Sequence, residues 1–441
     1  MKEITAEEIV KMAMDKGSDS AEVYMKSSRG ISAEAKNGNV EALEVSEDRG
    51  TSLKVIKNKR LGFAFTTDPD DIGKMIDEAV QAAEWTGVDE FMDIPELAAH
   101  EDVLMFDKNI KNIKEDDVIS EALLLEESAL SFDERIKRVR KAEAGSGTAV
   151  TTIVNSKGLN VKYESSYYSV YLTALAEDGN GDSQMGWDYA GSRRVKDIDV
   201  RFVGQEAARR AMELLGSRKI STLKAPVIFS PSVAGEFLDI LSASISADAV
   251  QKQRSFLAGK EGLKIISPLV EIIDDGRMDW HIGTRPVDDE GVPTATKAII
   301  SEGVLNGYIH NTYTAKKGMT TSTGNAVRGG FKGLPGVGVM NCYIKPSDTS
   351  SDDLVKSLSK GIVVLGAMGV HTANPVSGDF SIGISGLWVE NGEVAYPIKE
   401  AIISGNVLDL FNKVEAVGSD LKFYGSTGSP SLLIGDMDIS A

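Results

Sequence analysis

The chain has 441 residues, which is enough for two or three domains with a sizeable core. Its 48 Lys and Arg residues against 66 Asp and Glu residues give a net charge of −18, and such a chain repels phosphate backbones, so we expect no nucleic-acid partner. The single cysteine, Cys342, excludes an internal disulfide and a multi-cysteine metal site. No apolar run reaches the roughly 18 residues of a membrane span, and the charged first residues lack a signal-peptide core. We therefore expect a cytoplasmic protein without membrane contact.

The first part of the chain alternates helices with strands that favour antiparallel pairing. Thr5 and Glu8 have the spacing of a capping box, which predicts a helix that ends near Lys16. A second helix is predicted after Pro69, where apolar residues recur at helical spacing. Asn37-Gly38 predicts a hairpin turn. The strands predicted between the two helices cover residues 23–26, 31–35, 40–46, 51–57 and 61–67.

The next part of the chain predicts a helix over 115–130 and another over 204–215. Three long strands lie between them, over 136–144, 148–155 and 161–176. The segment after the second helix is typical of a linker. We therefore predict an N-terminal domain of mixed antiparallel sheet and helix, residues 1–219, followed by a strand-rich C-terminal domain, residues 220–441.

The second half begins with a short apolar strand over 225–229, followed by a helix that begins at Ser230-Pro231. Glu302-Gly303 and Asn391-Gly392 predict two hairpins, with strands over 296–301 and 304–311 in the first and over 387–389 and 393–403 in the second. The pattern indicates the α+β class with a large antiparallel component. One apolar stripe indicates that the helix is buried on one side, and it comprises Ala234, Phe237, Leu238, Leu241 and Ile245.

Known motifs for phosphate, calcium and nucleophilic sites are incomplete. The segment 336–341 has Asn where a dinucleotide fingerprint needs its last Gly. The segment 178–182 fills the first three ligand positions of a calcium loop but lacks the following Gly, so we interpret it as a hairpin turn. His371, Ser377 and Asp379 occur in one segment, for which we favour a hydrogen-bonded turn over a catalytic site.

The histidines, carboxylate clusters and basic residues do not form a recognisable metal or nucleic-acid motif. No two of the four histidines lie within five residues of each other, and Asp274-Asp275 and 288–290 are the carboxylate clusters that could bind a hard cation. Such clusters more often form turns or accept backbone N–H bonds. A basic run over 135–141 predicts a solvated strand face.

Seven short motifs, in this order, resemble those of the TldD/PmbA family, and within it the PmbA (TldE) branch. Each motif alone is weak, but together they span nearly the whole chain. The matching segments are 17–23, 229–234, 288–293, 303–308, 322–326, 374–380 and 416–420.

The resemblance implies a peptidase made of two different proteins. In the TldD branch, a helix with the pattern H-E-x-x-x-H and a C-terminal Cys hold a metal that activates water. PmbA-branch proteins lack this metal site and pair with TldD. In the alignment that the resemblance gives, Asp239 and Ser244 occupy the two His positions and Ile240 the Glu position, while 421–430 has no Cys. The resemblance therefore implies no catalytic and no metal-binding residue in this chain.

The leading hypothesis is a non-catalytic subunit of a cytosolic metallopeptidase that trims or degrades peptides, with zinc or another divalent metal only in a TldD-type partner. One alternative is a metal-independent or atypical hydrolase that uses residues of the 288–290 cluster or His371. The other alternative is a modulator of DNA gyrase that acts alone by protein binding.

Loop residues of the C-terminal half are the candidates for a peptide cleft, because binding residues collect on loops between strands. An extended peptide could add to a free strand edge there. The pairing that the resemblance implies predicts a homodimer when the chain is alone and a heterodimer with TldD. The cleft candidates are Asp288, Asp289, Glu290, Asn325 and Arg328.

Overall fold

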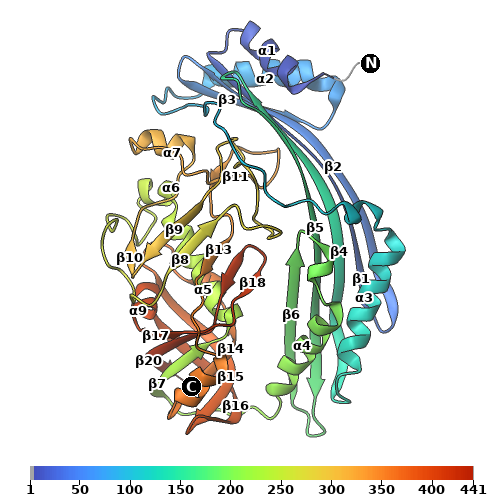
Figure 1. Ribbon diagram of the computed structural model, residues 1–441, viewed down its shortest axis with the longest axis vertical. Helices are drawn as coiled ribbons and strands as arrows, with labels where there is room; N and C mark the ends of the chain where they lie inside the picture. The colour runs from blue at the N-terminus through green and yellow to red at the C-terminus, as the bar shows by residue number, and fades with distance from the viewer. Residues whose placement is uncertain (1–3, 441) are drawn as a thin grey trace.

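A tall, curved sheet forms one side of the protein, and the second half of the chain packs against it (Figure 1). The computed structural model describes residues 4–440. The sheet has six antiparallel strands in the order β3-β2-β1-β4-β5-β6. Their bounds are β1 Ser20–Lys36, β2 Asn39–Lys57, β3 Arg60–Thr66, β4 Ile136–Asn155, β5 Asn160–Glu177 and β6 Ser183–Ser192.

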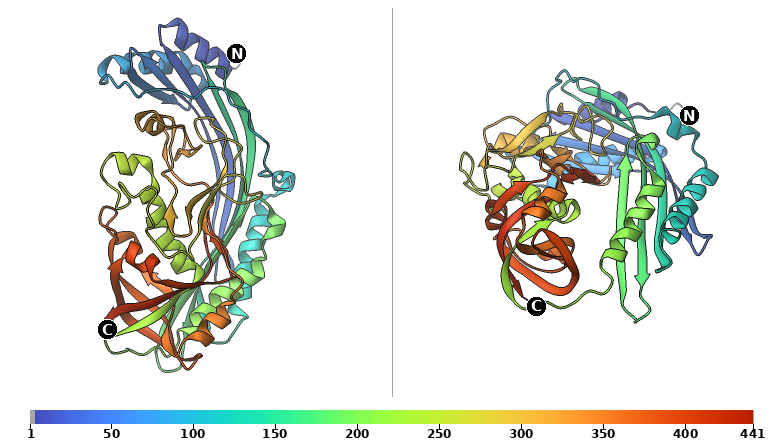
Figure 2. Two further views of the ribbon diagram at one scale, coloured as in Figure 1. Left: turned by 60° about the vertical axis from the view of Figure 1, so that its left-hand side comes forward. Right: turned by 60° about the horizontal axis from the view of Figure 1, so that its bottom comes forward.

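Helices cover one face of this sheet, and the C-terminal half covers the other (Figure 2). The alternation of side chains along a strand explains this division. Val23 of β1 is buried among the first two helices, whereas the next residue, Tyr24, packs with Phe331 of the C-terminal half. The helices are α1 Ala6–Asp15, α2 Ile72–Trp85, α3 Glu115–Leu130 and α4 Val200–Glu213.

The strands β1, β2 and β4 are each continuous where the sequence predicted two separate strands, so those predicted breaks were wrong. Glycines caused the error, because they weaken a strand pattern. In the structure they admit aromatic rings instead: a Cβ atom at Gly50 would overlap the ring of Phe331, and one at Gly147 the ring of Tyr167. Ring packing against the bare backbone thus keeps the strands unbroken.

Other predictions for the first half hold. Thr5 and Glu8 form the capping box of α1. The basic run in β4 leaves its Lys and Arg side chains largely exposed and buries Ile136 and Val139. Asp178 accepts hydrogen bonds from the backbone N–H groups of Asn180 and Asp182, which confirms the turn. The edge strand β6 was not predicted.

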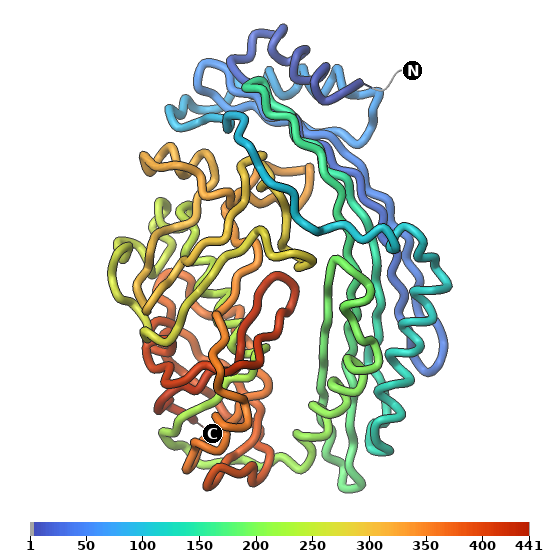
Figure 3. The backbone as a smooth tube through the Cα atoms, viewed as in Figure 1, coloured from blue at the N-terminus to red at the C-terminus, as the bar shows by residue number. Residues whose placement is uncertain are grey.

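A long connection links α2 to α3 and lies against both halves of the molecule (Figure 3). The backbone N–H of Trp280 donates to the Leu104 carbonyl at 2.7 Å, and the Leu104 N–H donates to Asp279 at 2.9 Å. The next residue, Met105, accepts from the Ser166 N–H of β5 at 3.1 Å. This connection therefore ties the sheet to the C-terminal half.

The C-terminal half contains two further six-stranded sheets. The first has the order β16-β15-β14-β7-β20-β17, and an additional β16–β20 pairing closes five of its strands into a barrel. The second has the order β10-β9-β8-β13-β19-β18. The strands of the first are β7 Leu223–Phe229, β14 Lys360–Met368, β15 Asp379–Glu390, β16 Glu393–Asn406, β17 Val414–Val417 and β20 Leu432–Ser440. Those of the second are β8 Ile272–Asp275, β9 Thr296–Ser301, β10 Val304–Leu305, β13 Cys342–Ile344, β18 Lys422–Tyr424 and β19 Thr427–Ser429.

The helix α5, Pro231–Ile245, packs between these two sheets, and its predicted apolar stripe is buried. Phe237 stacks on Phe229 and meets Phe380 edge to face, with ring centroids 5.2 and 4.9 Å apart. The remaining short elements are α6 Ala247–Gln251, α7 Thr312–Lys317, α8 Ser351–Ser357, α9 Val407–Asn412, β11 Ala326–Val327, β12 Gly336–Val337 and four 3₁₀ turns at 69–71, 108–112, 195–197 and 370–372.

The two predicted hairpins are present, and their turn residues adopt positive φ angles as such turns require. The strand predicted over 304–311 is only two residues long. Asn306 still bonds the Ala298 carbonyl of β9 through its side chain, but Tyr308 donates to the Leu257 carbonyl outside β9. The α+β class is confirmed. The predicted boundary between residues 219 and 220 falls between α4 and β7 and stays a prediction.

Candidate functional site

The helix α5 carries the positions at which the resemblance places a metal site. Ser230 precedes the helix in an extended conformation and Pro231 occupies its first turn, where the missing proline N–H costs nothing. One side of α5 is packed into the core, so Asp239 on its other side is exposed, while Ile240 is half-buried and packs against the edge of the same core. We call Asp239, Ile240 and Ser244 the α5 positions.

The structure brings the α5 positions next to the C-terminal segment that the alignment paired with them. The Thr427 hydroxyl of β19 donates a hydrogen bond to the Asp239 carboxylate. Cys342 lies beside Thr427 in the parallel pairing of β13 with β19, and its thiol is fully buried. Ser244 is buried too, and its hydroxyl donates to the Ile240 carbonyl at 3.2 Å.

These side chains do not fit a transition-metal site. Ile240 has no acid–base chemistry, Ser244 uses its hydroxyl within the helix, and Asp239 offers a single carboxylate. A structural or catalytic zinc site takes three or four Cys, His or carboxylate ligands. Over residues 4–440, no group of three or more such side chains is close enough to hold a metal ion.

Two carboxyl groups nevertheless share this helix surface. Burial and the negative charge of Asp239 raise the pKa of Glu236 to about 7. Although Asp239 is partly exposed, the partial loss of water around its carboxyl raises its pKa, against the hydrogen bond from Thr427. The i, i+3 spacing makes the two carboxyls neighbours, so the charge of Asp239 disfavours ionisation of Glu236.

The predicted cleft residues lie elsewhere, in a buried cluster where the C-terminal half meets the sheet. We call this cluster the charged junction. All of its carboxylates are at most 3% exposed. Its members are Glu22 and Lys54 from the sheet and Arg285, Asp288, Asp289, Glu290 and Arg328 from the C-terminal half.

Each carboxylate of the 288–290 cluster has its own donors. Asp288 accepts three backbone N–H bonds at 2.9 Å each, from Glu290, Val292 and Ala326. This confirms that the cluster accepts backbone N–H bonds. Asp289 instead accepts from the Arg285 guanidinium at 3.0 Å and from a backbone N–H at 2.7 Å.

The remaining charges of the junction bridge the two halves. The Lys54 ammonium lies 3.4 Å from Glu290, and the Arg328 guanidinium lies 2.7 Å from Glu22. The Arg328 guanidinium also sits over the ring of Tyr24, 4.8 Å from its centroid. Charge pairs of this kind are most stable inside a protein when further hydrogen bonds satisfy them. Glu290 has such a bond, from the Thr312 N–H at 2.8 Å, whereas the second carboxylate oxygen of Glu22 is buried without a hydrogen-bond partner.

Burial perturbs the acids of this cluster. It raises the pKa of Glu22, against the nearby charges of Lys54 and Arg328. Burial and the charge of Glu290 raise the pKa of Asp288 to about 8, although three backbone N–H bonds act in the opposite direction. Acids with raised pKa values of this kind occur both in functional sites and in structural ion networks.

Asn325 lies beside the charged junction rather than in it. Its amide donates to Asp274 at 2.8 Å and to the Gly338 carbonyl at 2.9 Å, and it is fully buried. Asp274 also pairs with Lys297 at 3.1 Å. Of the five predicted cleft residues, the structure therefore brings four together and places the fifth next to them. Their role in peptide binding stays a prediction.

Sequence patterns did not indicate Glu22, Lys54 or Arg285 as partners of this cluster. Glu22 and Lys54 face each other across β1 and β2. An opposite-charge pair at directly opposed positions is the signal that could have found them, but it depends on knowing the strand register.

The segment that holds His371, Ser377 and Asp379 forms a hydrogen-bonded turn. Asn374 accepts hydrogen bonds from the N–H groups of Val376 and Ser377, which confirms the turn. Ser377 donates to Asp379 at 2.7 Å, and this bond together with one from an asparagine lowers the pKa of Asp379. His371 is exposed.

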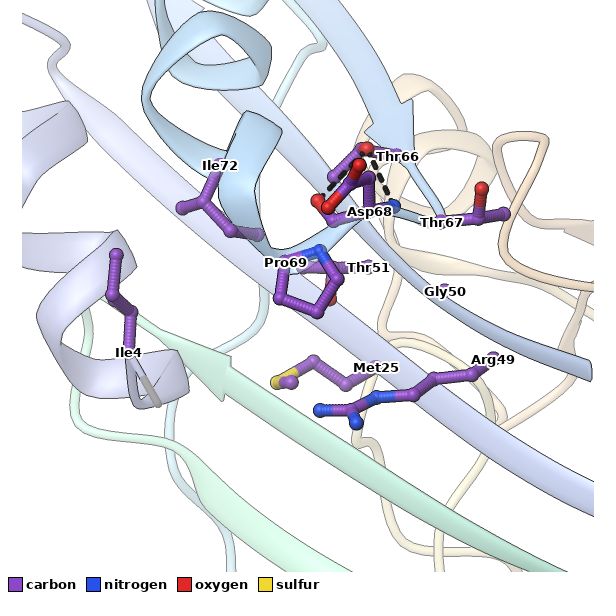
Figure 4. Close-up of a pocket in the computed structure, with 10 residues that line it drawn as sticks. All are labelled: Ile4, Met25, Arg49, Gly50, Thr51, Thr66, Thr67, Asp68, Pro69 and Ile72. Carbon is purple, nitrogen blue, oxygen red and sulfur yellow. Dashed lines mark hydrogen bonds between the residues drawn. The ribbon is translucent and has the colours of Figure 1, made fainter. Parts of the chain in front are cut away.

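Two further features concern the apolar character of the helices and a small pocket near α2. Within residues 4–440, none of the helices combines the length and apolar character of a membrane crossing. The pocket between β2, β3 and α2 is lined by Met25, Arg49, Thr51 and Pro69, among others (Figure 4). Its volume of about 20 Å³ holds one water molecule at most.

The chain matches three domains that are described as PmbA/TldA metallopeptidase domains. Domain 1 matches residues 21–83, the central domain residues 108–215 and the C-terminal domain residues 222–441. These matches cover most of the chain.

Individual relatives match over nearly their whole length. The metalloprotease PmbA homolog of Buchnera aphidicola subsp. Acyrthosiphon pisum is 32% identical over 431 residues, 96% of this chain and 93% of the relative. Metalloprotease PmbA of Escherichia coli O157:H7 is 30% identical over 446 residues, 98% of this chain and 96% of the relative. A crystal structure from Thermotoga maritima, named a modulator of a DNA gyrase, has a TM-score of 0.92 and 28% identity, and covers 98% of this chain and 99% of that one.

Proposed function

The chain belongs to the PmbA/TldD metallopeptidase family, and from this premise we propose that it is the non-catalytic subunit of a two-protein peptidase. In this proposal the chain works in the cytoplasm and pairs with a TldD-type subunit, and the pair trims or degrades peptides. Zinc or another divalent metal belongs to the partner alone.

The observation that carries this proposal is the state of the α5 positions. The helix and its contact with β19 are both present, as a family scaffold requires. Asp239, Ile240 and Ser244, however, supply one carboxylate, one alkyl group and one hydroxyl that is already bonded. These groups support a subunit that keeps the shape of the catalytic helix and leaves the chemistry to its partner.

Enzymatic activity of the chain by itself is the main competitor, because the names of the bacterial relatives describe metalloproteases. The acids of the charged junction are poorly suited to a hydrolase. Asp288, Asp289 and Glu290 are buried and already hold backbone or side-chain donors. The name of the Thermotoga protein favours a second candidate, binding to DNA gyrase.

The test combines this chain with a TldD-type protein that has an intact H-E-x-x-x-H motif. We expect cleavage of an unfolded peptide only in the mixture, a heterodimer by light scattering in the mixture, and a homodimer for the chain alone. Elemental analysis should find no stoichiometric zinc or iron in the isolated chain.

The matched control is the same mixture with the first His of the partner's motif changed to Ala. That mixture should still form the heterodimer and should not cleave. Cleavage by the isolated chain, or one tightly held transition metal per chain, would contradict the proposal. A stable complex with gyrase and none with the TldD-type protein would favour the gyrase-binding candidate.

A further inference from the structure

A cavity lies between the sheet and the charged junction, on the face of the sheet that the C-terminal half covers. Its volume is about 120 Å³. Strand β1 contributes two side chains that share this face because they are two residues apart. The lining residues are Tyr24, Lys26, Met105, Thr151, Tyr163, Ser165, Arg193, Arg285, Asp289 and Arg328.

Four of the lining side chains are cationic and one is anionic. Two of the cations have carboxylate partners. Arg285 pairs with Asp289 at 3.0 Å, and Arg328 pairs with Glu22 at 2.7 Å. Within these pairs the charges offset each other. The remaining two cations therefore give the lining of the cavity a positive net charge.

Those two cations, Lys26 and Arg193, form no ion pair with any carboxylate in the described part of the chain. The Arg193 guanidinium donates only to backbone carbonyls, including those of Ser166 at 3.1 Å and His281 at 3.3 Å. Burial and the neighbouring charge of Arg285 lower the pKa of Arg193 to about 10. A largely buried guanidinium that has carbonyl acceptors but no carboxylate partner keeps an unneutralised charge, and an anion beside it would offset that charge.

The cavity also offers neutral donors. Burial and the charge of Asp289 raise the pKa of Tyr163 to about 12 and that of Tyr24 above its usual range, so both hydroxyls stay protonated. Thr151 and Ser165 add two aliphatic hydroxyls. Arg285 uses one N–H for Asp289, which leaves other N–H groups of its fork to donate.

The size of the cavity limits what can enter. A volume of 120 Å³ is several times the roughly 10–15 Å³ that one water molecule needs. A phosphate ion or the carboxylate end of a small molecule fits this space. The local positive charge contrasts with the net charge of −18 for the whole chain.

We propose that this cavity is a binding site for a small oxyanion, either a carboxylate or a phosphate. Lys26 and Arg193 compensate its charge, and Arg285 and Tyr163 supply hydrogen bonds, whereas the Tyr24 hydroxyl donates to Asp289. The site joins residues from both halves of the molecule, so an anion bound there also strengthens their contact. The inference does not depend on the peptidase assignment.

The test measures binding of inorganic phosphate and of acetate to the intact chain by calorimetry and thermal unfolding, at constant ionic strength so that screening does not change. A third arm compares a short peptide that has a free C-terminal carboxylate with its C-terminal amide. We expect saturable binding of at least one oxyanion with a Kd of about 1 mM or tighter. Binding of phosphate alone identifies a phosphoryl ligand, and binding of the acid peptide but not the amide identifies a peptide terminus.

Two variants make the proposal falsifiable. Lys26→Met removes an unpaired cation and should weaken binding by about tenfold or more, since hydrogen bonds to charged groups are the strong ones. Lys36→Met, on the same strand but outside the cavity, is the matched control and should bind as the unmodified chain does. Tyr163→Phe provides an independent loss of one donor if Lys26→Met fails to fold. Absence of saturable binding, or equal binding by Lys26→Met and Lys36→Met, would overturn the proposal.

Discussion

The α5 positions and the charged junction are both polar regions of the C-terminal half, but their polar groups have opposite surroundings. On α5, Asp239 is exposed and has one side-chain partner, and Ser244 bonds only to its own helix. In the junction, buried carboxylates are matched by guanidinium, ammonium and backbone donors.

The difference shows which charges this chain needs for folding. A buried charge without a partner costs several kcal/mol, so each member of the junction constrains the others. The α5 positions carry no such constraint, because Asp239 is exposed, Ile240 and Ser244 are uncharged, and the helix is held by its apolar stripe. The junction is therefore expected to be sensitive to substitution, and the α5 positions tolerant.

The largest effect is expected for Arg328→Met. The change leaves Glu22 buried beside Tyr24 without its guanidinium partner, which should lower the free energy of unfolding by about 3–5 kcal/mol. Urea unfolding followed by circular dichroism measures this loss. Arg138→Met is the matched control, because Arg138 pairs with Glu177 at the surface, and it should cost about 1 kcal/mol or less. Equal losses in the two variants would show that the junction is not a special constraint.

Local patterns predicted much of the fold. The capping box at Thr5, the turn at Asn37-Gly38 and the apolar stripe of α5 each depend on neighbours in sequence, and each is present. Gly50 misled the strand prediction because its partner, the Phe331 ring, lies far away in sequence. The missed strand β6 is an edge strand in which several polar residues interrupt the alternation.

The candidate site was less predictable for the same reason. The acids at 288–290 were visible as a cluster, but their burial was not, because it depends on Glu22 and Lys54 from a sheet more than 230 residues away in sequence. Arg193 stands in no motif, and only the closure of the C-terminal half over β5 places it against the cavity.

A smaller effect is expected for Glu236→Gln, and it depends on pH. The folded pKa of Glu236, about 7, lies above the value of about 4.3 in an unfolded chain, so the folded state binds more protons between these values. Stability that is present at pH 4 is therefore lost as the pH rises through this window. Glu236→Gln removes the loss and should stabilise the chain by about 1 kcal/mol at pH 8, after allowance for solvent screening of a half-buried group.

Urea unfolding at pH 5 and pH 8 tests this dependence. The stabilisation by Glu236→Gln should be smaller at pH 5 than at pH 8. Glu127→Gln, on the exposed side of α3, is the control and should show no such difference. A stabilisation of Glu236→Gln that is the same at both pH values would assign the effect to packing and not to charge.

The smallest effect is expected at the α5 positions themselves. Asp239→Ala removes one exposed carboxylate and Ser244→Ala one intrahelical hydrogen bond, so peptide cleavage by the mixture with a TldD-type subunit should stay within a few-fold of that with the unmodified chain. Leu241→Ala, in the buried stripe of the same helix, should instead cost about 2–5 kcal/mol of stability. If α5 serves this chain as a scaffold, sensitivity to substitution follows the apolar stripe of the helix, which includes Leu241 and not Ser244. A variant of Asp239 or Ser244 that folds and still assembles, yet supports no cleavage, would show that sensitivity follows the family's catalytic positions, and the chain would then contribute directly to the reaction.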